Sequence, residues 1–264
     1  MKILITGHKG FIGQNLMKYL SNDEVDGWEF GDSEYPNVKG YDLVIHLGAI
    51  SATTERDVDK IMSQNYEFSY KLFVACCQHN VDFHYASSAS VYGPGENGFK
   101  ETAPPAPMNP YAWSKYLFDR LVLKTLPNVN INVYGFRYFN VFGPHEEHKG
   151  AQASLWSKWT RSSGPHALFE ESDRVYRDFI HVDDVCYVHN YFIENPPQSG
   201  IYNVGSGKAT CIADAARTFS GVEFDKVPMP DELKGQYQFY TQADISKLLN
   251  VIGEYSFKEF HQDS

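Results

Sequence analysis

A tyrosine and a lysine four residues apart, Tyr111 and Lys115, have side chains that together can move a proton. Residues four apart on a helix share a face, so the ammonium group can lie beside the phenol and a bound cofactor. A free phenol has a pKa near ~10 and is a poor base at neutral pH. A fixed positive charge lowers that pKa, so we expect Lys115 to make Tyr111 a usable base toward a substrate hydroxyl.

Ser88 is the third residue of this arrangement. It follows a predicted strand, residues 83–87, and precedes the tyrosine and lysine across a proline-rich loop, residues 92–110. Pro110 suits the first position of the helix that carries Tyr111. The Ser88 hydroxyl can hydrogen-bond the same substrate oxygen. These three residues predict a proton-handling site, although the same spacing also occurs by chance in many helices.

A glycine-rich turn lies at the start of the chain, after a predicted strand at residues 2–6 and before a predicted helix. Gly7 permits the turn, Gly10 lets the backbone approach a pyrophosphate, and Gly13 allows close packing of helix on strand. A plain tight turn is the alternative, but a strand before and a helix after are the context that a dinucleotide site requires.

The next segment bears on the choice of cofactor. A predicted strand at residues 25–30 is followed by Asp32, where an acidic residue commonly binds the adenosine ribose. Lys9, inside the glycine turn, can instead pair with a 2′-phosphate. The cofactor is therefore expected to be tightly bound NADP or NAD, with NADP slightly favoured. Only residues 33–40 separate this strand from the next, at 43–47, so the second β-α unit is expected to be shortened.

Further strands are predicted at residues 131–137, 179–182 and 201–204, with helical segments between the strands. This alternation predicts an α/β fold, a Rossmann-type doubly wound parallel sheet with a small C-terminal substrate-binding domain. We assign residues 1–144 and 175–202 to the dinucleotide-binding domain, and 145–174 and 203–264 to the substrate domain. Ligands of such sheets bind beyond the carboxyl ends of the strands, where Gly48, Ala49 and Ser88 lie.

The composition and net charge of the chain exclude some classes of binding partner. A net charge of -10 argues against a nucleic-acid partner, and no apolar run is long enough to cross a membrane. No signal peptide is visible, and the four cysteines show no metal-ligand spacing, so we expect a cytoplasmic protein with small-molecule ligands. His145 and His148 are three apart and do not match the spacing of a zinc protease, so no metal site is predicted.

Several segments together resemble the extended short-chain dehydrogenase/reductases and, within them, the ADP-glyceromanno-heptose 6-epimerases. The broad resemblance rests on the three glycines, Ser88, Tyr111 and Lys115. The narrower resemblance rests on residues 51–55 (SATTE), 85–89 (YASSA), 135–141 (GFRYFNV), 148–150 (HKG), 233–238 (LKGQYQ) and 241–244 (TQAD).

This resemblance implies a nucleotide-sugar epimerase of carbohydrate metabolism that makes a lipopolysaccharide precursor. It would invert C6″ of ADP-glycero-manno-heptose by transient oxidation to a 6″-ketone and re-reduction, with NAD(P) bound. In the family, proton handling on the two faces of the sugar belongs to the positions of Tyr111 and Lys149, while Lys115 holds the nicotinamide ribose and Ser88 the substrate oxygen. Homo-oligomers are usual in the family, and their dimers commonly pack through helices near residues 65–77 and 111–126.

The remaining site residues follow from the same resemblance. Cofactor contacts are expected from Gly7, Lys9, Gly10, Phe11, Ile12, Gly13, Asp32, Leu47, Gly48, Ala49, Ser51, Asn65, Tyr111, Lys115 and Val141. Substrate contacts are expected from Ser88, Asn140, Lys149, Ala151, Lys158, Phe169, Glu170, Ser172, Arg177 and Tyr237. A guanidinium can bind a diphosphate bidentately, although by local sequence Arg177 can equally form a salt bridge with Asp178.

Three departures from the family pattern stand out: the shortened second β-α unit, alanine rather than serine at residue 151, and a chain that stops soon after Phe260. They leave room for another epimerase or reductase acting on a nucleotide sugar, or for an NAD(P)-binding protein without turnover.

Overall fold

The computed structural model describes residues 1–32, 35–95, 98–162, 164–231, 233–235 and 237–261, and only the backbone of residue 151. The main sheet contains β1 (Lys2–Thr6), β2 (Glu24–Trp28), β3 (Leu43–His46), β4 (Asp82–Ser88), β5 (Val133–Tyr138) and β9 (Gly200–Val204). The other strands are β6 (Asn140–Phe142), β7 (His166–Phe169), β8 (Tyr176–His181), β10 (Ala209–Cys211) and β11 (Phe224–Val227). The α-helices are α1 (Phe11–Tyr19), α2 (Val58–Ile61), α3 (Phe68–His79), α4 (Pro110–Thr125), α5 (Leu155–Arg161), α6 (Val182–Glu194), α7 (Ile212–Arg217) and α8 (Ser246–Ile252).

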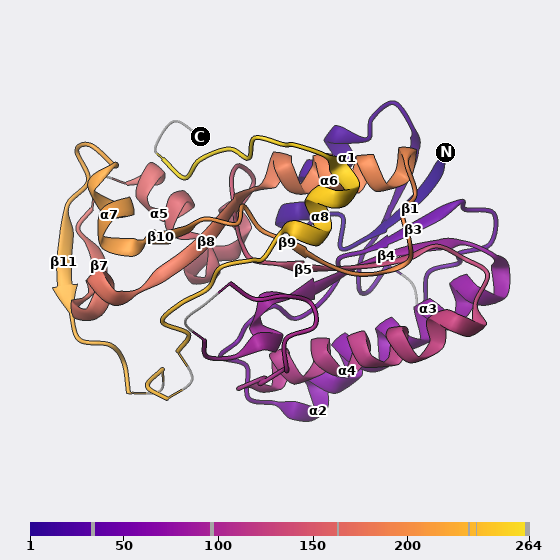
Figure 1. Ribbon diagram of the computed structural model, residues 1–264, viewed down its shortest axis with the longest axis horizontal. Helices are drawn as coiled ribbons and strands as arrows, with labels where there is room; N and C mark the ends of the chain where they lie inside the picture. Colours follow the sequence, from indigo (N-terminus) through magenta and orange to yellow (C-terminus); the bar gives the residue numbers. More distant parts are fainter. Residues whose placement is uncertain (33–34, 96–97, 163, 232, 236, 262–264) are drawn as a thin grey trace.

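The six strands of the main sheet are all parallel, in the order β2-β1-β3-β4-β5-β9. Helices cover both faces: α1, α6 and α8 lie on one side of the sheet and α3 and α4 on the other (Figure 1). Residues along these strands are buried almost without interruption, so the strands contribute apolar side chains to the helix layers on both faces of the sheet. The predicted doubly wound parallel fold is confirmed.

The second β-α unit is shortened, as predicted. β2 ends at Trp28, two residues earlier than predicted, and forms the edge of the sheet. Between β2 and β3 no helix forms in the described residues. Instead, Val38 joins the buried cluster that contains Trp28 and Leu72, and Tyr35 and Tyr41 pack against it. The loop thus covers apolar surface that a helix would otherwise bury.

The two smaller sheets lie at one end of the molecule (Figure 1). β8 lies between β6 and β10, and β11 pairs with β7. Their core is aromatic and includes Phe142, Trp159, Phe179 and Phe219, with Phe260 packed against it. The predicted domain division assigns β8 and its partner β6 to the dinucleotide-binding unit and its other partner, β10, to the substrate domain, so it divides a single sheet. The division itself remains a proposal.

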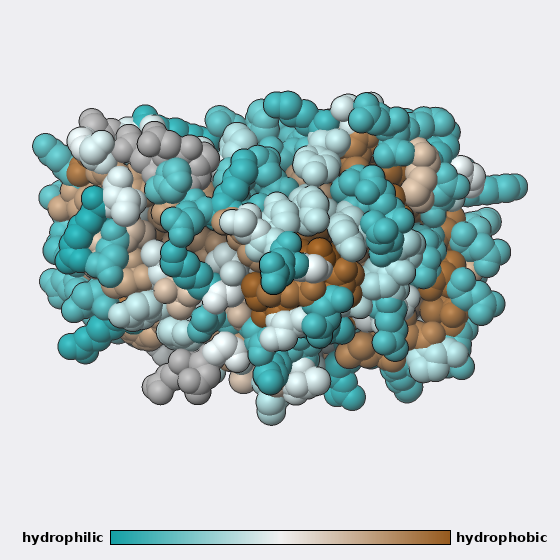
Figure 2. Space-filling view, turned by 45° about the horizontal axis from the view of Figure 1, so that its top comes forward, coloured by the Kyte–Doolittle hydropathy of each residue, from teal (hydrophilic) through white to brown (hydrophobic). Residues whose placement is uncertain are grey.

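The face of the molecule seen in Figure 2 is largely hydrophilic, with apolar side chains in smaller patches. Among the helices that the structure describes, none combines the length and the apolar character needed to cross a bilayer.

Candidate active site

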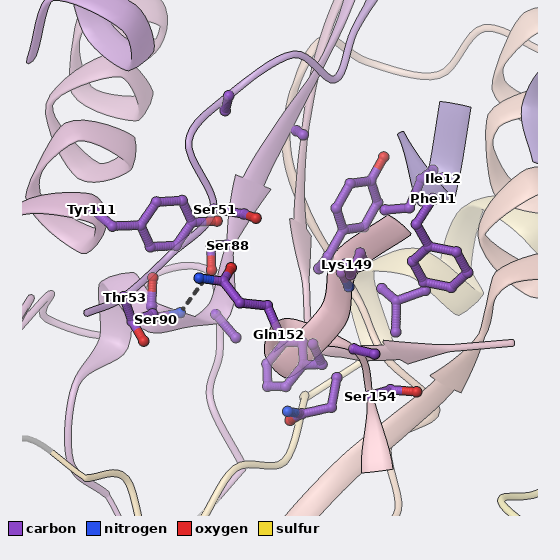
Figure 3. Close-up of a pocket in the computed structure, with 18 of the residues that line it drawn as sticks. Phe11, Ile12, Ser51, Thr53, Ser88, Ser90, Tyr111, Lys149, Gln152 and Ser154 are labelled. Carbon is purple, nitrogen blue, oxygen red and sulfur yellow. Dashed lines mark hydrogen bonds between the residues drawn. The ribbon is translucent and has the colours of Figure 1, made fainter. Parts of the chain in front are cut away.

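A cavity of about 880 Å³ opens at the carboxyl ends of the parallel strands. It is lined by the glycine turn after β1, the ends of β3, β4 and β5, the start of α4, and the segment 148–155. Tyr111, Lys115, Ser88 and Lys149 all line this one cavity. In Figure 3, Tyr111 and Ser88 lie on one side and Lys149 on the other, beside Phe11.

The start of α4 fixes the two residues whose spacing suggested chemistry. Asn109 caps the helix, its side-chain oxygen accepting from the Ala112 amide at 2.9 Å, and Pro110 occupies the first turn. Lys115 is only 6% exposed and donates to the main-chain oxygen of Ala86 at 2.8 Å. Its Nζ atom lies 5.9 Å from the centre of the Tyr111 ring. The ammonium and the phenol therefore share a helix face, as the sequence predicted.

The predicted lowering of the Tyr111 pKa is not found in this structure. Burial raises the pKa of the phenol because it removes water from the phenolate, and the Ser88 hydroxyl, which hydrogen-bonds Tyr111, opposes that rise. Burial also lowers the pKa of Lys115 to about 8, with Asp119 acting in the opposite direction. The Lys115 ammonium group is hydrogen-bonded to Ala86, and its charge alone does not offset the rise in the Tyr111 pKa that burial causes.

Lys149 reaches the cavity from a 3₁₀ segment, Glu147–Gln152. Its Nζ atom donates to Glu146 Oε2 at 3.1 Å and lies 4.9 Å from the centre of the Phe11 ring. Phe11 begins α1, directly after the glycine turn. Lys149 therefore lies next to the predicted dinucleotide site and in the same cavity as Tyr111.

The glycine turn fits a pyrophosphate. A Cβ atom on Gly13 would lie 2.2 Å from the oxygen of Gly7, and one on Gly7 would lie 2.6 Å from the nitrogen of Gly48. Side chains are therefore excluded where the backbone must come close to a ligand. No side chain caps the start of α1, so its first amide groups are directed at the cavity edge formed by Gly10 and Phe11. The residues present fit the phosphates of a dinucleotide.

Most of the predicted cofactor contacts lie around this cavity. Those that line it are Gly7, Gly10, Phe11, Ile12, Gly13, Leu47, Ala49, Ser51, Tyr111, Lys115 and Val141. Gly48 lies behind them, its backbone against Gly7.

Asp32, Lys9 and Asn65 are not among the residues that line the cavity. Asp32 Oδ2 accepts from the amide of Glu29, 2.7 Å away, which closes a turn of its own. Lys9 is exposed. Asn65 bonds both backbone groups of Ile50 and donates to the Ser114 hydroxyl at 3.2 Å, so it holds the loop after β3 to α4.

Glu29 is an acidic residue beside the glycine turn, although, like Asp32, it is not among the residues that line the cavity. It follows the end of β2, and its Oε1 atom accepts from the Lys9 amide at 2.7 Å and lies 3.6 Å from His8 Nδ1. Because β2 ends at Trp28, Glu29 rather than Asp32 directly follows the strand.

The predicted substrate contacts divide into two groups. Ser88, Asn140, Lys149, Arg177 and Tyr237 line the cavity, whereas Lys158, Phe169, Glu170 and Ser172 do not. The side chain of Ala151 lies outside the described residues. Two residues of the second group have another partner: the Lys226 ammonium group binds the Ser172 hydroxyl and the main-chain oxygen of Phe169 at the end of β7.

Arg177 packs its guanidinium on the Tyr237 ring, 5.0 Å from the ring centre, and donates to the oxygen of Tyr176. Asp178 faces the opposite side of β8, where it accepts from Ser206, Gly207 and Ala243. The structure therefore favours Arg177 as a ligand-facing residue over a salt bridge with its neighbour.

Sequence reasoning missed Gln152, which lines the cavity together with Ser90 and Thr53. In Figure 3 its amide group points toward the end of β4, where Ser88 lies. Its position three residues after Lys149 was the only available signal. Tyr138 also lines the cavity, with its hydroxyl 2.6 Å from His189 Nε2.

Comparisons with known proteins identify the family of this chain. The model of the NAD dependent epimerase/dehydratase family matches residues 32–205. An ADP-L-glycero-D-manno-heptose-6-epimerase from Brachyspira hyodysenteriae is 38% identical, with 93% of this chain and 90% of the relative aligned.

Two solved structures show the same fold. The ADP-L-glycero-D-manno-heptose-6-epimerase of Helicobacter pylori superposes with a TM-score of 0.86 at 23% identity, covering 99% of this chain and 93% of that one. A UDP-N-acetylglucosamine 4-epimerase from Methanobrevibacter ruminantium M1 superposes with a TM-score of 0.85 at 24% identity, covering 98% and 93%. With a glycine cradle, a tyrosine and lysine on α4, and these matches over most of its length, the chain belongs to the NAD dependent epimerase/dehydratase family.

Proposed function

We propose that this protein inverts C6″ of ADP-glycero-manno-heptose, with a nicotinamide cofactor held at the glycine turn. One observation supports this most directly: Tyr111 and Lys149 line a single cavity from opposite sides. Inversion at one carbon needs a proton handler on each face of the sugar. The relative with 38% identity bears the name of this activity.

Each residue then has a defined task. Tyr111 accepts the proton of the C6″ hydroxyl in its phenolate form, and Ser88 hydrogen-bonds the same oxygen. Burial disfavours that form, whereas the Ser88 hydroxyl favours it, and the positive charge of an oxidised nicotinamide would favour it further when the cofactor is bound. The cofactor, when bound, supplies hydride removal and hydride return. Lys115 contributes positive charge behind the phenol, and Lys149 gives a proton to the oxygen when the ketone presents its other face. Arg177, stacked on Tyr237, is placed to bind the diphosphate.

We further propose NAD as the preferred cofactor, in place of the slight preference for NADP that Lys9 suggested. The Glu29 carboxylate lies at the end of β2, beside the glycine turn, where it can accept from a ribose 2′-hydroxyl and repel a 2′-phosphate. Lys9 is exposed, and it contributes its amide to Glu29.

A homo-oligomer is also proposed. Tyr70 on α3 and Trp113 and Leu123 on α4 are each more than two-fifths exposed, which suits packing between copies of this chain. Light scattering coupled to size exclusion would give the mass. A monomer at all concentrations would contradict this proposal.

The central experiment incubates the purified protein with ADP-D-glycero-D-manno-heptose and follows the C6″ proton by NMR. Wild type is expected to interconvert the two epimers. Tyr111→Phe should lose at least about 100-fold in kcat while keeping its bound cofactor. Tyr116→Phe, on the same helix, is the matched control and should retain activity. A cofactor-loaded wild type that leaves the sugar unchanged would overturn the proposal.

A further inference from the structure

Glu146 is a buried carboxylate at the edge of the active-site cavity, with a fully covered side chain. Its Oε2 atom accepts from Lys149 Nζ at 3.1 Å and from the Ser154 amide at 2.8 Å, and its Oε1 atom accepts from the Ser154 hydroxyl at 2.5 Å. A buried carboxylate is stable only when such donors replace water. Both of its oxygens therefore have partners, and one of these is a residue with a proposed catalytic role.

The backbone that carries Lys149 does little by itself to orient the amine. It is a short 3₁₀ segment with a break at Gly150, where φ is 52°, and it follows His145, where φ is 71°. Glu146 connects this segment to α5, because Ser154, which it binds, also caps that helix. The carboxylate thus links the Lys149 amine to a regular element.

The Glu146 carboxylate forms an ion pair with the ammonium group of Lys149. Lys158 on α5 is the second cation nearby: burial is the main cause that lowers its pKa, Lys149 lowers it further, and Glu146 raises it. Glu147, the next residue, points elsewhere and pairs with Arg161 at 3.1 Å. Glu146 is therefore the carboxylate that faces Lys149 from within the fold.

We propose that Glu146 is the positioning residue for Lys149, holding its Nζ as an ammonium ion directed at the face of the sugar opposite Tyr111. This inference rests on the proposed function. As the ketone carbon receives hydride, an N–H bond of Lys149 breaks and an O–H bond forms on the sugar. The neutral amine is left beside a carboxylate, which favours recovery of a proton from water, and Lys149 keeps 25% of its side chain exposed for that purpose.

The first test is kinetic. Glu146→Gln keeps the shape and removes the charge, and it should lower kcat about tenfold or more with little change in KM, because the acid is misplaced while binding is retained. Glu146→Asp keeps the charge and should recover part of that loss. Glu147→Gln makes the same chemical change one residue along, at an exposed carboxylate, and should behave as wild type.

The second test does not depend on turnover. Acetylation of Lys149 by acetic anhydride at a fixed pH of 7, read by peptide mass spectrometry of the full chain, reports how readily the amine leaves its contact with Glu146 and meets the reagent. Weakening that contact should raise the rate about tenfold in Glu146→Gln, and not in Glu147→Gln. If Glu146→Gln does not fold, Glu146→Asp decides by the same measurement, with a smaller rise expected.

Unchanged kinetics and unchanged labelling in the folded Glu146 variants would overturn the inference. If wild type turns over no heptose but the labelling of Lys149 still responds to Glu146, the proposed function fails and the positioning role stands.

Discussion

The ammonium group of Lys115 donates a hydrogen bond to the main-chain oxygen of Ala86, 2.8 Å away. Ala86 belongs to β4, two residues before Ser88, so this bond joins the helix of Tyr111 to the strand of Ser88. The bond also fixes the lysine charge 5.9 Å from the phenol ring, almost without exposure to water. Lys115 therefore both holds α4 against β4 and places a positive charge near the Tyr111 phenol.

Lys115→Met is expected to lower kcat at least about 100-fold and to stabilise the fold at neutral pH. The second effect follows because burial lowers the pKa of Lys115 from 10.5 to about 8, which means that the folded protein holds this proton less tightly than the unfolded chain. The free energy of unfolding of wild type should therefore rise relative to Lys115→Met between pH 8 and 10.5. Urea unfolding across this range measures it.

Lys124→Met is the control, because Lys124 is an exposed lysine on the same helix. Its unfolding free energy should track wild type over the whole pH range. A Lys115→Met variant that does the same would contradict burial of a charged amine at this position.

Glu29→Gln should weaken the discrimination between cofactors. Wild type is expected to bind NAD at least about tenfold more tightly than NADP, a difference of ~1.4 kcal/mol, because a carboxylate repels a 2′-phosphate. Loss of the charge should reduce that ratio toward one. Fluorescence titration with NADH and NADPH measures both affinities.

Asp32→Asn is the matched control for this substitution, since its carboxylate binds only within its own turn in the described structure. The cofactor ratio should not change. If Asp32→Asn shifts the ratio and Glu29→Gln does not, the original assignment of Asp32 is restored.

The difference between Glu29 and Asp32 shows what the sequence can and cannot predict. The strand, the glycine turn and the shortened loop were readable from apolar runs and glycine spacing, which are local signals. The end of β2 was not, because Phe30 follows Trp28 at the two-residue spacing of a strand and so extends the pattern past the true end. The choice of acidic residue depended on that end.

Tyr111 and Lys115 were predictable for a related reason: Pro110 and the four-residue spacing define the helix start and its face. Local sequence signals could not show that Phe169 and Ser172, both predicted substrate contacts, are not among the residues that line the cavity. Lys226, 54 residues beyond Ser172, binds both, and a tertiary contact at that distance leaves no mark in the local pattern.

Gln152→Ala is expected to raise KM for the heptose substrate about tenfold, with a smaller effect on kcat. Its amide points across the cavity toward Ser88 and Ser90, and a hydrogen bond to a sugar hydroxyl contributes ~1–1.5 kcal/mol. Initial rates at varied substrate give KM and kcat separately. A fall in kcat alone would show that Gln152 acts on the chemical step instead.

Asp119→Asn should lower the free energy of unfolding by about 3–5 kcal/mol, because it leaves the buried Arg137 without its charge partner. Asp119 Oδ2 accepts from Arg137 Nε at 2.8 Å and from Ser87 Oγ at 3.0 Å, while Oδ1 accepts from Tyr85. These bonds join α4, which carries Tyr111, to β4, which carries Ser88, and to β5. Urea unfolding gives the stability change, and the epimerase assay gives its effect on the site.

Glu24→Gln breaks an ion pair with Lys2 at the protein surface and should lower the free energy of unfolding far less than Asp119→Asn. Comparing the two variants separates a buried pair from an exposed one. Asp119 contacts neither Tyr111 nor Lys149, so any fall in kcat that accompanies its replacement would come from movement of α4 against β4 or from the loss of its charge near Lys115. An Asp119→Asn variant as stable as Glu24→Gln would mean that Arg137 finds other acceptors, such as the Tyr92 hydroxyl 2.9 Å from Nη1.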